Sequence, residues 1–192
     1  AGTKNRSCNQ RQVAQAMAGL ANGKFVPRAH LIKQVQNASN QVVESFAPPP
    51  LTTLDIKEED LAVIHGGMID CVNAGNGTGR WGSCSYATVA GKTGTAEWSQ
   101  GRYLAWFAGF VPSKNPRFAF AVVYEGYRGQ GLSGGRNAGP LARRFLNSVY
   151  GDRDSMYWAE GRPLSANKDE EAEDDSNEDK PAASSRSRKS NR

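Results

Sequence analysis

Apolar residues recur at helical spacing in two stretches of the first half of the chain. Residues 10–22 predict a helix that is closed by Gly23 as its C-cap. The apolar face of this helix consists of Val13, Ala14, Met17, Leu20 and Ala21. Residues 55–75 predict a second helix, with Asp55 or Asp60 near its start and Gly75 at its end. Its apolar stripe consists of Leu61, Ile64, Met68, Ile69 and Val72.

Three strand-like runs come next, at residues 86–98, 103–112 and 117–126. The links between them, SQGR and SKNP, have turn-forming composition and are too short to carry a parallel crossover, so they predict an antiparallel meander. A final helix is predicted at 134–151. Its inward side chains are expected to be Leu141, Phe145, Leu146 and Val149. The order of elements indicates an α+β fold in which helices cover an antiparallel sheet.

The chain divides into a body, residues 1–164, and a charged tail, residues 165–192. The tail has almost no apolar residues and carries an acidic block followed by a basic one. Such a segment buries too little surface to offset the entropy of ordering, so we expect it to be disordered. In the body, the segment FAPPPL at 46–51 predicts a rigid, extended connector between the first two helices, because proline fixes φ and donates no hydrogen bond.

Composition narrows the class of protein. The 192 residues are 38% hydrophobic and 22% charged, which suffices for one globular domain or for part of a larger one. No apolar run is long enough to span a bilayer. The chain starts without a Met or a signal-like segment, so we expect a fragment or a processed chain.

The three cysteines match no zinc spacing and leave one thiol unpaired, and no metal or cofactor is expected. The net charge of +5 fits an anionic partner or a solvated positive face; the terminal RSRKS is too short a basic run to predict nucleic-acid binding.

Two glycine-rich segments invite a nucleotide interpretation and fail its requirements. The triplet Gly91-Lys92-Thr93 matches the end of a phosphate-binding loop, but the position that such a loop requires to be glycine is Tyr86. The segment GQGLSG at 129–134 matches a dinucleotide fingerprint, but no second strand with an acidic ribose ligand comes after its helix. Both segments therefore need another explanation.

If residues 91–95 form a strand, they present groups that suit a carboxylate ligand. Side chains alternate, so Lys92 and Gly94 share one face while Thr93 and Thr95 share the other. The glycines allow a ligand or another backbone to approach closely. An ammonium, a hydroxyl and the backbone N–H of Thr95 at the rim of a cleft could hold a carboxylate, with a peptide running antiparallel to the strand.

The segment AGKTGTAEW at 90–98 resembles the third signature of the penicilloyl-serine transferases. Its surroundings resemble class B penicillin-binding proteins, the elongation-type transpeptidases especially. The segments that carry this resemblance are QVAQAMAGLANGKFVPRAHLIKQV, LAVIHGGMIDCVNAGNGTG, AWFAGFVPSKNPRFAFAVVYEG and GGRNAGPLARRFLNSVY, within residues 10–150. The resemblance implies the C-terminal portion of the penicillin-binding/β-lactamase-like transpeptidase fold.

The family's chemistry is acyl transfer, in which a serine attacks the penultimate D-alanyl carbonyl of a stem peptide. The resemblance implies catalytic roles for Lys92, in the proton network, and for Thr95, whose N–H is half of an oxyanion hole. It implies substrate-binding roles for Thr93, which bonds the terminal carboxylate, and for Gly94. It also implies peptidoglycan stem peptides and β-lactam antibiotics as ligands, a membrane glycosyltransferase as partner, and a place on the periplasmic side of the inner membrane.

Two elements that the family needs before this motif are not recognisable. The only Ser-x-x-Lys, Ser165 to Lys168, lies in the tail, and Ser7-Cys8-Asn9 matches Ser-x-Asn only formally, close to the first helix. We therefore expect this chain to be the C-terminal half of a transpeptidase domain, without the nucleophile, its partner lysine and the membrane anchor. We expect the isolated chain to be catalytically inactive.

Two alternatives stay open. One is a β-lactamase or β-lactam sensor domain, whose deacylation machinery would be encoded upstream. The other is a non-catalytic scaffold that keeps the cleft edge and binds peptide; an upstream Ser-x-x-Lys would favour the enzyme over this scaffold. His30 and His65 are expected to serve packing or the surface, because this mechanism uses lysine as its base.

Overall fold

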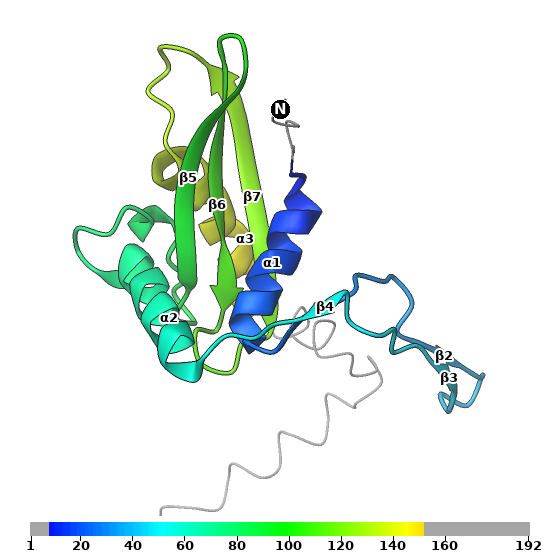
Figure 1. The fold of residues 1–192 in the computed structure, drawn as a ribbon. Helices are drawn as coiled ribbons and strands as arrows, with labels where there is room; N and C mark the ends of the chain where they lie inside the picture. The colour runs from blue at the N-terminus through cyan, green and yellow to red at the C-terminus, as the bar shows by residue number, and fades with distance from the viewer. Residues whose placement is uncertain (1–7, 152–192) are drawn as a thin grey trace, which may run out of the picture.

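A computed structural model describes residues 8–151, so the predicted tail and the boundary at residue 164 lie outside the described residues. Figure 1 shows an upright three-stranded sheet with helices around it and a long excursion between the first two helices. The elements of the body are α1 (Gln10–Asn22), α2 (Glu58–Asn73), the short turn η1 (Arg80–Gly82), β5 (Ala90–Ser99), β6 (Arg102–Val111), β7 (Phe118–Tyr127), the π-helical turn η2 (Gly134–Ala138) and α3 (Gly139–Gly151).

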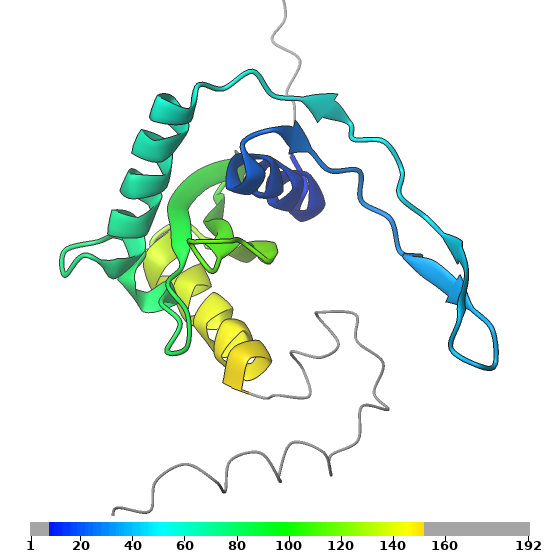
Figure 2. The ribbon, with the colours of Figure 1, turned by 90° about the horizontal axis from the view of Figure 1, so that it is seen from below.

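The sheet is an antiparallel meander of order β5-β6-β7, as predicted. Helices α1 and α3 lie on opposite faces, and α2 lies beside β5 (Figure 2). On one face Ala90 and Phe110 pack with Met17 and Leu20 of α1. On the other face the strands pack against α3; the buried residues there include Val89, Phe107, Val111, Ala142 and Leu146. The α+β class and the helical cover of an antiparallel sheet are confirmed.

The first helix begins and ends where the sequence predicts. The side chain of Asn9 accepts a hydrogen bond from the Gln12 amide at 2.9 Å, and the Gln12 side chain accepts one from the Asn9 amide at 3.0 Å. This reciprocal capping satisfies two donors that the first turn leaves free. At the other end Gly23 has φ of +66° and donates to the Gly19 carbonyl, which is the left-handed cap that glycine favours. Asn9 thus has a structural role.

The second helix begins between the two aspartates that the sequence indicates, and it ends at Asn73, before the predicted Gly75. Lys57 is its N-cap and makes no side-chain bond, while Asp60 lies in the first turn with Glu58 and Glu59. Three carboxylates at the positive end of the helix dipole stabilise this start. Within residues 8–151 no helix has both the length and the apolar character that a membrane span needs.

The inward face of α3 differs in part from the prediction. Leu146 is buried and Val149 half-buried, as predicted, but Leu141 and Phe145 are 42% and 61% exposed and Ala142 is buried. Ala142 and Leu146 are four residues apart and share one face of the helix, whereas Leu141 and Phe145 each precede them by one residue and lie about 100° round the helix.

The excursion between α1 and α2 consists of two antiparallel pairs that the sequence pattern does not predict. Its strands are β1 (Phe25–Val26), β2 (Gln34–Gln36), β3 (Val42–Ser45) and β4 (Thr52–Thr53), with β1 paired to β4 and β2 to β3. The β2–β3 hairpin extends away from the sheet in both views (Figures 1 and 2). Its strands are too short and too exposed to show a strong alternation of apolar and polar residues.

Phe107 is the centre of the α3-side core. It is fully buried, and its ring lies against three glycines. A Cβ added at Gly82 would lie 2.3 Å from the ring, one at Gly91 2.9 Å, and one at Gly79 3.1 Å. No side chain fits at these positions without moving the ring, so the loop after α2 and strand β5 are both brought against Phe107.

Substitution of Gly82 tests this packing. We expect Gly82→Ala to lower the free energy of unfolding by about 1–3 kcal/mol, since overpacking displaces a buried ring. The matched control is Gly67→Ala in the middle of α2, where nothing lies within 4 Å of the added methyl. That change should raise stability by up to about 1 kcal/mol, because alanine is the better helix former. Urea unfolding measures both; equal effects would contradict the packing role.

Tyr150 is a polar group in an apolar setting. Its ring packs edge-on against Phe118, with centroids 5.9 Å apart, and its buried hydroxyl has no partner among the described residues. Burial, with a smaller contribution from Cys84, raises the pKa of Tyr150 to about 12. The folded state therefore favours the protonated phenol.

This raised pKa makes stability depend on pH in the alkaline range. The tyrosine pKa is about 10 in the unfolded chain, so its contribution to stability is present below pH 10 and is lost as pH rises through the folded value of about 12. We expect the wild type to lose stability relative to Tyr150→Phe between pH 10 and pH 12, measured by denaturant unfolding at each pH. Parallel curves for the two proteins would contradict the raised pKa.

Candidate functional site

The predicted site residues lie on β5, at an edge that pairs with no other strand among residues 8–151. Two hydrogen bonds from side chains show which backbone carbonyls of β5 and of the residue before it face this unpaired edge. The Asn73 side chain donates to the Val89 carbonyl at 2.9 Å, and Lys92 Nζ donates to the Thr93 carbonyl at 2.9 Å. Backbone groups of every second residue point to the same side of a strand, so the N–H and C=O of Thr95 face this edge as well.

The side chains of Lys92 and Thr93 lie on opposite faces of the sheet, and the Lys92 ammonium bonds the Thr93 backbone at the edge. Lys92 lies opposite Ala108 and Thr93 opposite Phe107 in the β5–β6 register, which places Thr93 on the α3 side. The bond from Lys92 Nζ to the Thr93 carbonyl brings the ammonium round to the open edge. Lys92 is exposed and Thr93 half-buried. The ammonium thus lies at the Thr93 backbone on the open edge, while the Thr93 hydroxyl lies 3.0 Å from that of Thr78.

Gly94 lies between these groups and the turn η2. It pairs with Trp106, and a Cβ added at Gly134 would lie 2.7 Å from the Gly94 carbonyl oxygen and 2.1 Å from that of Trp106. The turn therefore rests directly on the sheet behind the motif. Close approach explains Gly134, and positive φ explains Gly129 and Gly131, so the apparent dinucleotide fingerprint consists of turn and packing glycines.

Thr78 lies beside the candidate site, a position that the sequence analysis did not predict. Its hydroxyl oxygen lies 3.0 Å from that of Thr93, and 3.4 Å from Cys71 Sγ. Thr78 belongs to the segment GNGTGRWGS between the second helix and the first long strand, which has no periodic pattern and suggests only a connection. The glycines on both sides of Thr78 were the available signal, because such glycines often mark a place where backbones approach closely.

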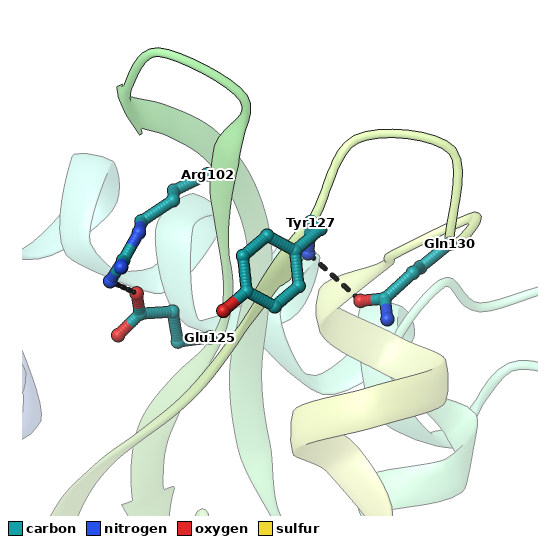
Figure 3. A network of polar contacts seen from close by, with 4 residues as sticks. All are labelled: Arg102, Glu125, Tyr127 and Gln130. Carbon is teal, nitrogen blue, oxygen red and sulfur yellow. Dashed lines mark hydrogen bonds and ion pairs between the residues drawn. The ribbon is translucent and has the colours of Figure 1, made fainter.

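A polar network fixes the far end of the sheet (Figure 3). Arg102 Nη1 donates to Glu125 at 2.7 Å, and the Gln130 side chain accepts from the Tyr127 amide at 2.8 Å. The second bond turns the chain at the end of β7 into the loop that leads to Ser133. The Ser133 hydroxyl then accepts from the Arg136 amide at 3.3 Å, which starts η2.

Other polar side chains near the helices have structural partners. His65 donates through Nε2 to the Leu20 carbonyl at 2.8 Å and packs on Phe110, with ring centroids 5.0 Å apart, so it joins α2 to the end of α1. Within residues 8–151 no three His, Cys, Asp or Glu side chains gather as a metal site would require.

Comparison with known proteins identifies the family. The model of the penicillin-binding protein transpeptidase domain matches residues 6–147, most of the chain. This chain belongs to that family. This chain is 33% identical over 162 residues to "Peptidoglycan D,D-transpeptidase MrdA" of Haemophilus influenzae. The alignment covers 74% of this chain and 24% of that protein. It is also 34% identical over 109 residues to "Probable peptidoglycan D,D-transpeptidase PenA" of Neisseria meningitidis. That alignment covers 54% of this chain and 19% of the relative. This chain therefore spans only about a fifth to a quarter of the length of these relatives.

Solved structures show the same fold. Penicillin-binding protein A of M. tuberculosis, an imipenem acyl-enzyme complex, has a TM-score of 0.58 at 20% identity, over 77% of this chain and 32% of that one. Penicillin-binding protein 2B of Streptococcus pneumoniae has a TM-score of 0.58 at 24% identity, over 74% and 24%. This chain thus has the penicillin-binding transpeptidase fold that its sequence predicts.

The ion pair in Figure 3 should add little stability. Both side chains are 48% exposed, so we expect Arg102→Gln to cost less than about 1 kcal/mol, and less still in 1 M salt. Arg128→Gln, in the neighbouring turn, is the matched control for loss of an exposed charge. A cost that salt leaves unchanged would show that the guanidinium acts through packing.

Proposed function

We propose that the complete protein containing this chain is a serine-type peptidoglycan D,D-transpeptidase that penicillin acylates. In this proposal the chain contributes the Lys-Thr-Gly strand, which binds the terminal carboxylate of the D-Ala-D-Ala stem peptide. The names of the similar relatives support the reaction class. The chain covers only part of those proteins, so activity, substrate and partners are all inferred.

The observation that carries this proposal is the bond from the Lys92 ammonium to the Thr93 carbonyl at the open edge of β5, which holds the charge next to the residue that bears the hydroxyl. A carboxylate placed there would receive a hydrogen bond from the Thr93 hydroxyl and face the ammonium of Lys92. The unpaired backbone of β5 would add main-chain bonds to an extended peptide. Gly94 presents no side chain beside that path.

Thr95 would act through its backbone. Its N–H faces the same edge as the Thr93 carbonyl, so it is suited to be one donor of an oxyanion hole. Such a donor stabilises the tetrahedral intermediate by about 3–4 kcal/mol when the geometry is right. Lys92 would act as a positive charge and a proton-network member beside the nucleophile.

The nucleophile would come from the part of the domain that precedes this chain. The serine oxygen attacks the penultimate D-alanyl carbonyl, the peptide bond breaks, and D-alanine leaves with the proton that the serine gave up. An amine of a neighbouring stem peptide then attacks the ester, forms the new amide and returns a proton to the serine. The isolated chain has only one wall of this site and should be inactive.

The proposal also sets the surroundings of the protein. The substrate lies in the bacterial cell envelope, so the active domain would face the periplasmic side of the inner membrane, held by an N-terminal anchor. A membrane glycosyltransferase would supply the glycan strands to be cross-linked. The ligands are peptidoglycan stem peptides and β-lactams; no nucleic acid and no cofactor enter the scheme.

Two other functions share this edge: a β-lactamase or β-lactam sensor, and a peptide-binding scaffold without catalysis. A β-lactamase would release the acyl group within seconds, whereas a transpeptidase would keep it. A scaffold would not form the covalent adduct at all. No feature of the described residues favours either over the transpeptidase.

Labelling with a fluorescent penicillin tests the proposal. We expect the complete protein to be labelled covalently and stably, and this chain alone to stay unlabelled. Lys92→Met and Thr93→Val in the complete protein should each lower the second-order acylation rate constant about 10- to 100-fold, which corresponds to the loss of a charged hydrogen bond.

Matched controls are Lys114→Met, at the exposed turn between β6 and β7, and Thr88→Val, exposed just before β5. Both should acylate like the wild type. Labelling of the isolated chain, or variants at positions 92 and 93 that react at the wild-type rate, would refute the assignment.

A further inference from the structure

The Thr78 hydroxyl lies at the motif but comes from a different part of the chain. It is 3.0 Å from the Thr93 hydroxyl and 3.4 Å from the Cys71 thiol, so it connects the end of α2 to the motif through two successive contacts. Thr78 itself is exposed. Its hydroxyl bonds to Thr93, the residue that is proposed to hold the substrate carboxylate.

A hydroxyl has one proton and can donate to one acceptor at a time. When Thr93 donates to Thr78, only its lone pairs face the ligand, and these repel a carboxylate. When Thr78 donates to Thr93, the Thr93 proton is free for the carboxylate. The Cys71 thiol is suited to donate to Thr78, so three donors can point in one direction, each polarising the next.

The position of Thr78 does not depend on its hydroxyl. The Gly79 amide donates to the Cys71 carbonyl at 2.8 Å, and the Gly77 amide to the Ala74 carbonyl at 2.9 Å. On the other side, a Cβ at Gly135 would lie 1.9 Å from the Thr78 carbonyl oxygen, so η2 presses directly on this loop. Backbone contacts hold the loop, which leaves the hydroxyl available to orient its neighbour.

We propose that Thr78 is a positioning residue: it donates its hydroxyl proton to Thr93, so that the Thr93 proton is aimed at the carboxylate of the ligand. This inference rests on the proposed function, because it needs Thr93 to bind a carboxylate. Its effect should therefore appear only with ligands that carry a carboxylate, and only when Thr93 is present.

The experiment uses the complete protein and two probes, a penicillin and its methyl ester. We expect Thr78→Val to lower the acylation rate constant for the free acid about tenfold, the usual loss for a hydrogen bond that supports a charged contact. The rate for the ester should change less than about twofold, since the ester has no anion to receive the proton. Thr78→Ser keeps the hydroxyl and should restore the wild-type rate.

A double-mutant cycle shows whether Thr78 acts through Thr93. In the Thr93→Val background, Thr78→Val should have no further effect on the free acid. If Thr78→Val does not fold, Thr78→Ala removes the same hydroxyl with less bulk and carries the same expectation.

The failures are distinguishable. A wild type that penicillin does not acylate would overturn the proposed function and this inference together. A wild type that reacts normally while Thr78→Val matches it, or loses as much rate with the ester as with the acid, would overturn the positioning role alone. Additive effects of the two valine substitutions would do the same.

Discussion

The packing of Phe107 is the constraint on which the rest of this structure depends. Its ring is fully buried and lies against Gly79, Gly82 and Gly91, which belong to the loop after α2 and to β5. Phe107 is also the direct cross-strand partner of Thr93. The same contact that closes the core therefore brings the loop over the motif strand and places the Thr78 hydroxyl beside that of Thr93. Core packing and site geometry have one origin.

Much of this arrangement is predictable because local signals are strong. Three apolar runs with two short polar links determine an antiparallel meander, and the spacing around Met17 and Leu20 determines α1. Alternation alone predicts that Lys92 and Thr93 lie on opposite faces of a strand, and the structure places them so. The family resemblance then gives those residues a chemistry.

The features that the sequence did not predict depend on contacts between residues far apart in the chain. The small Ala142 takes an inward position of α3 that side-chain size does not indicate, while Leu141 and Phe145 are exposed. The β2–β3 hairpin has exposed strands that show no alternation. Thr78 lies in a glycine-rich loop, and only the folded chain reveals that it meets Thr93. Contacts between segments 15 residues apart, made through a buried ring, leave no periodic signal in the sequence.

A crystal structure of the complete protein acylated by penicillin tests the central claim most directly. Two protonated hydroxyls and an ammonium at one strand edge should hold the carboxylate of the adduct. The account predicts a carboxylate oxygen within about 3 Å of Thr93 Oγ1, the ordinary hydrogen-bond range, with Thr78 still bonded to Thr93 on its other side. An adduct whose carboxylate lies away from β5, or a Thr93 hydroxyl without contact to it, would contradict the account.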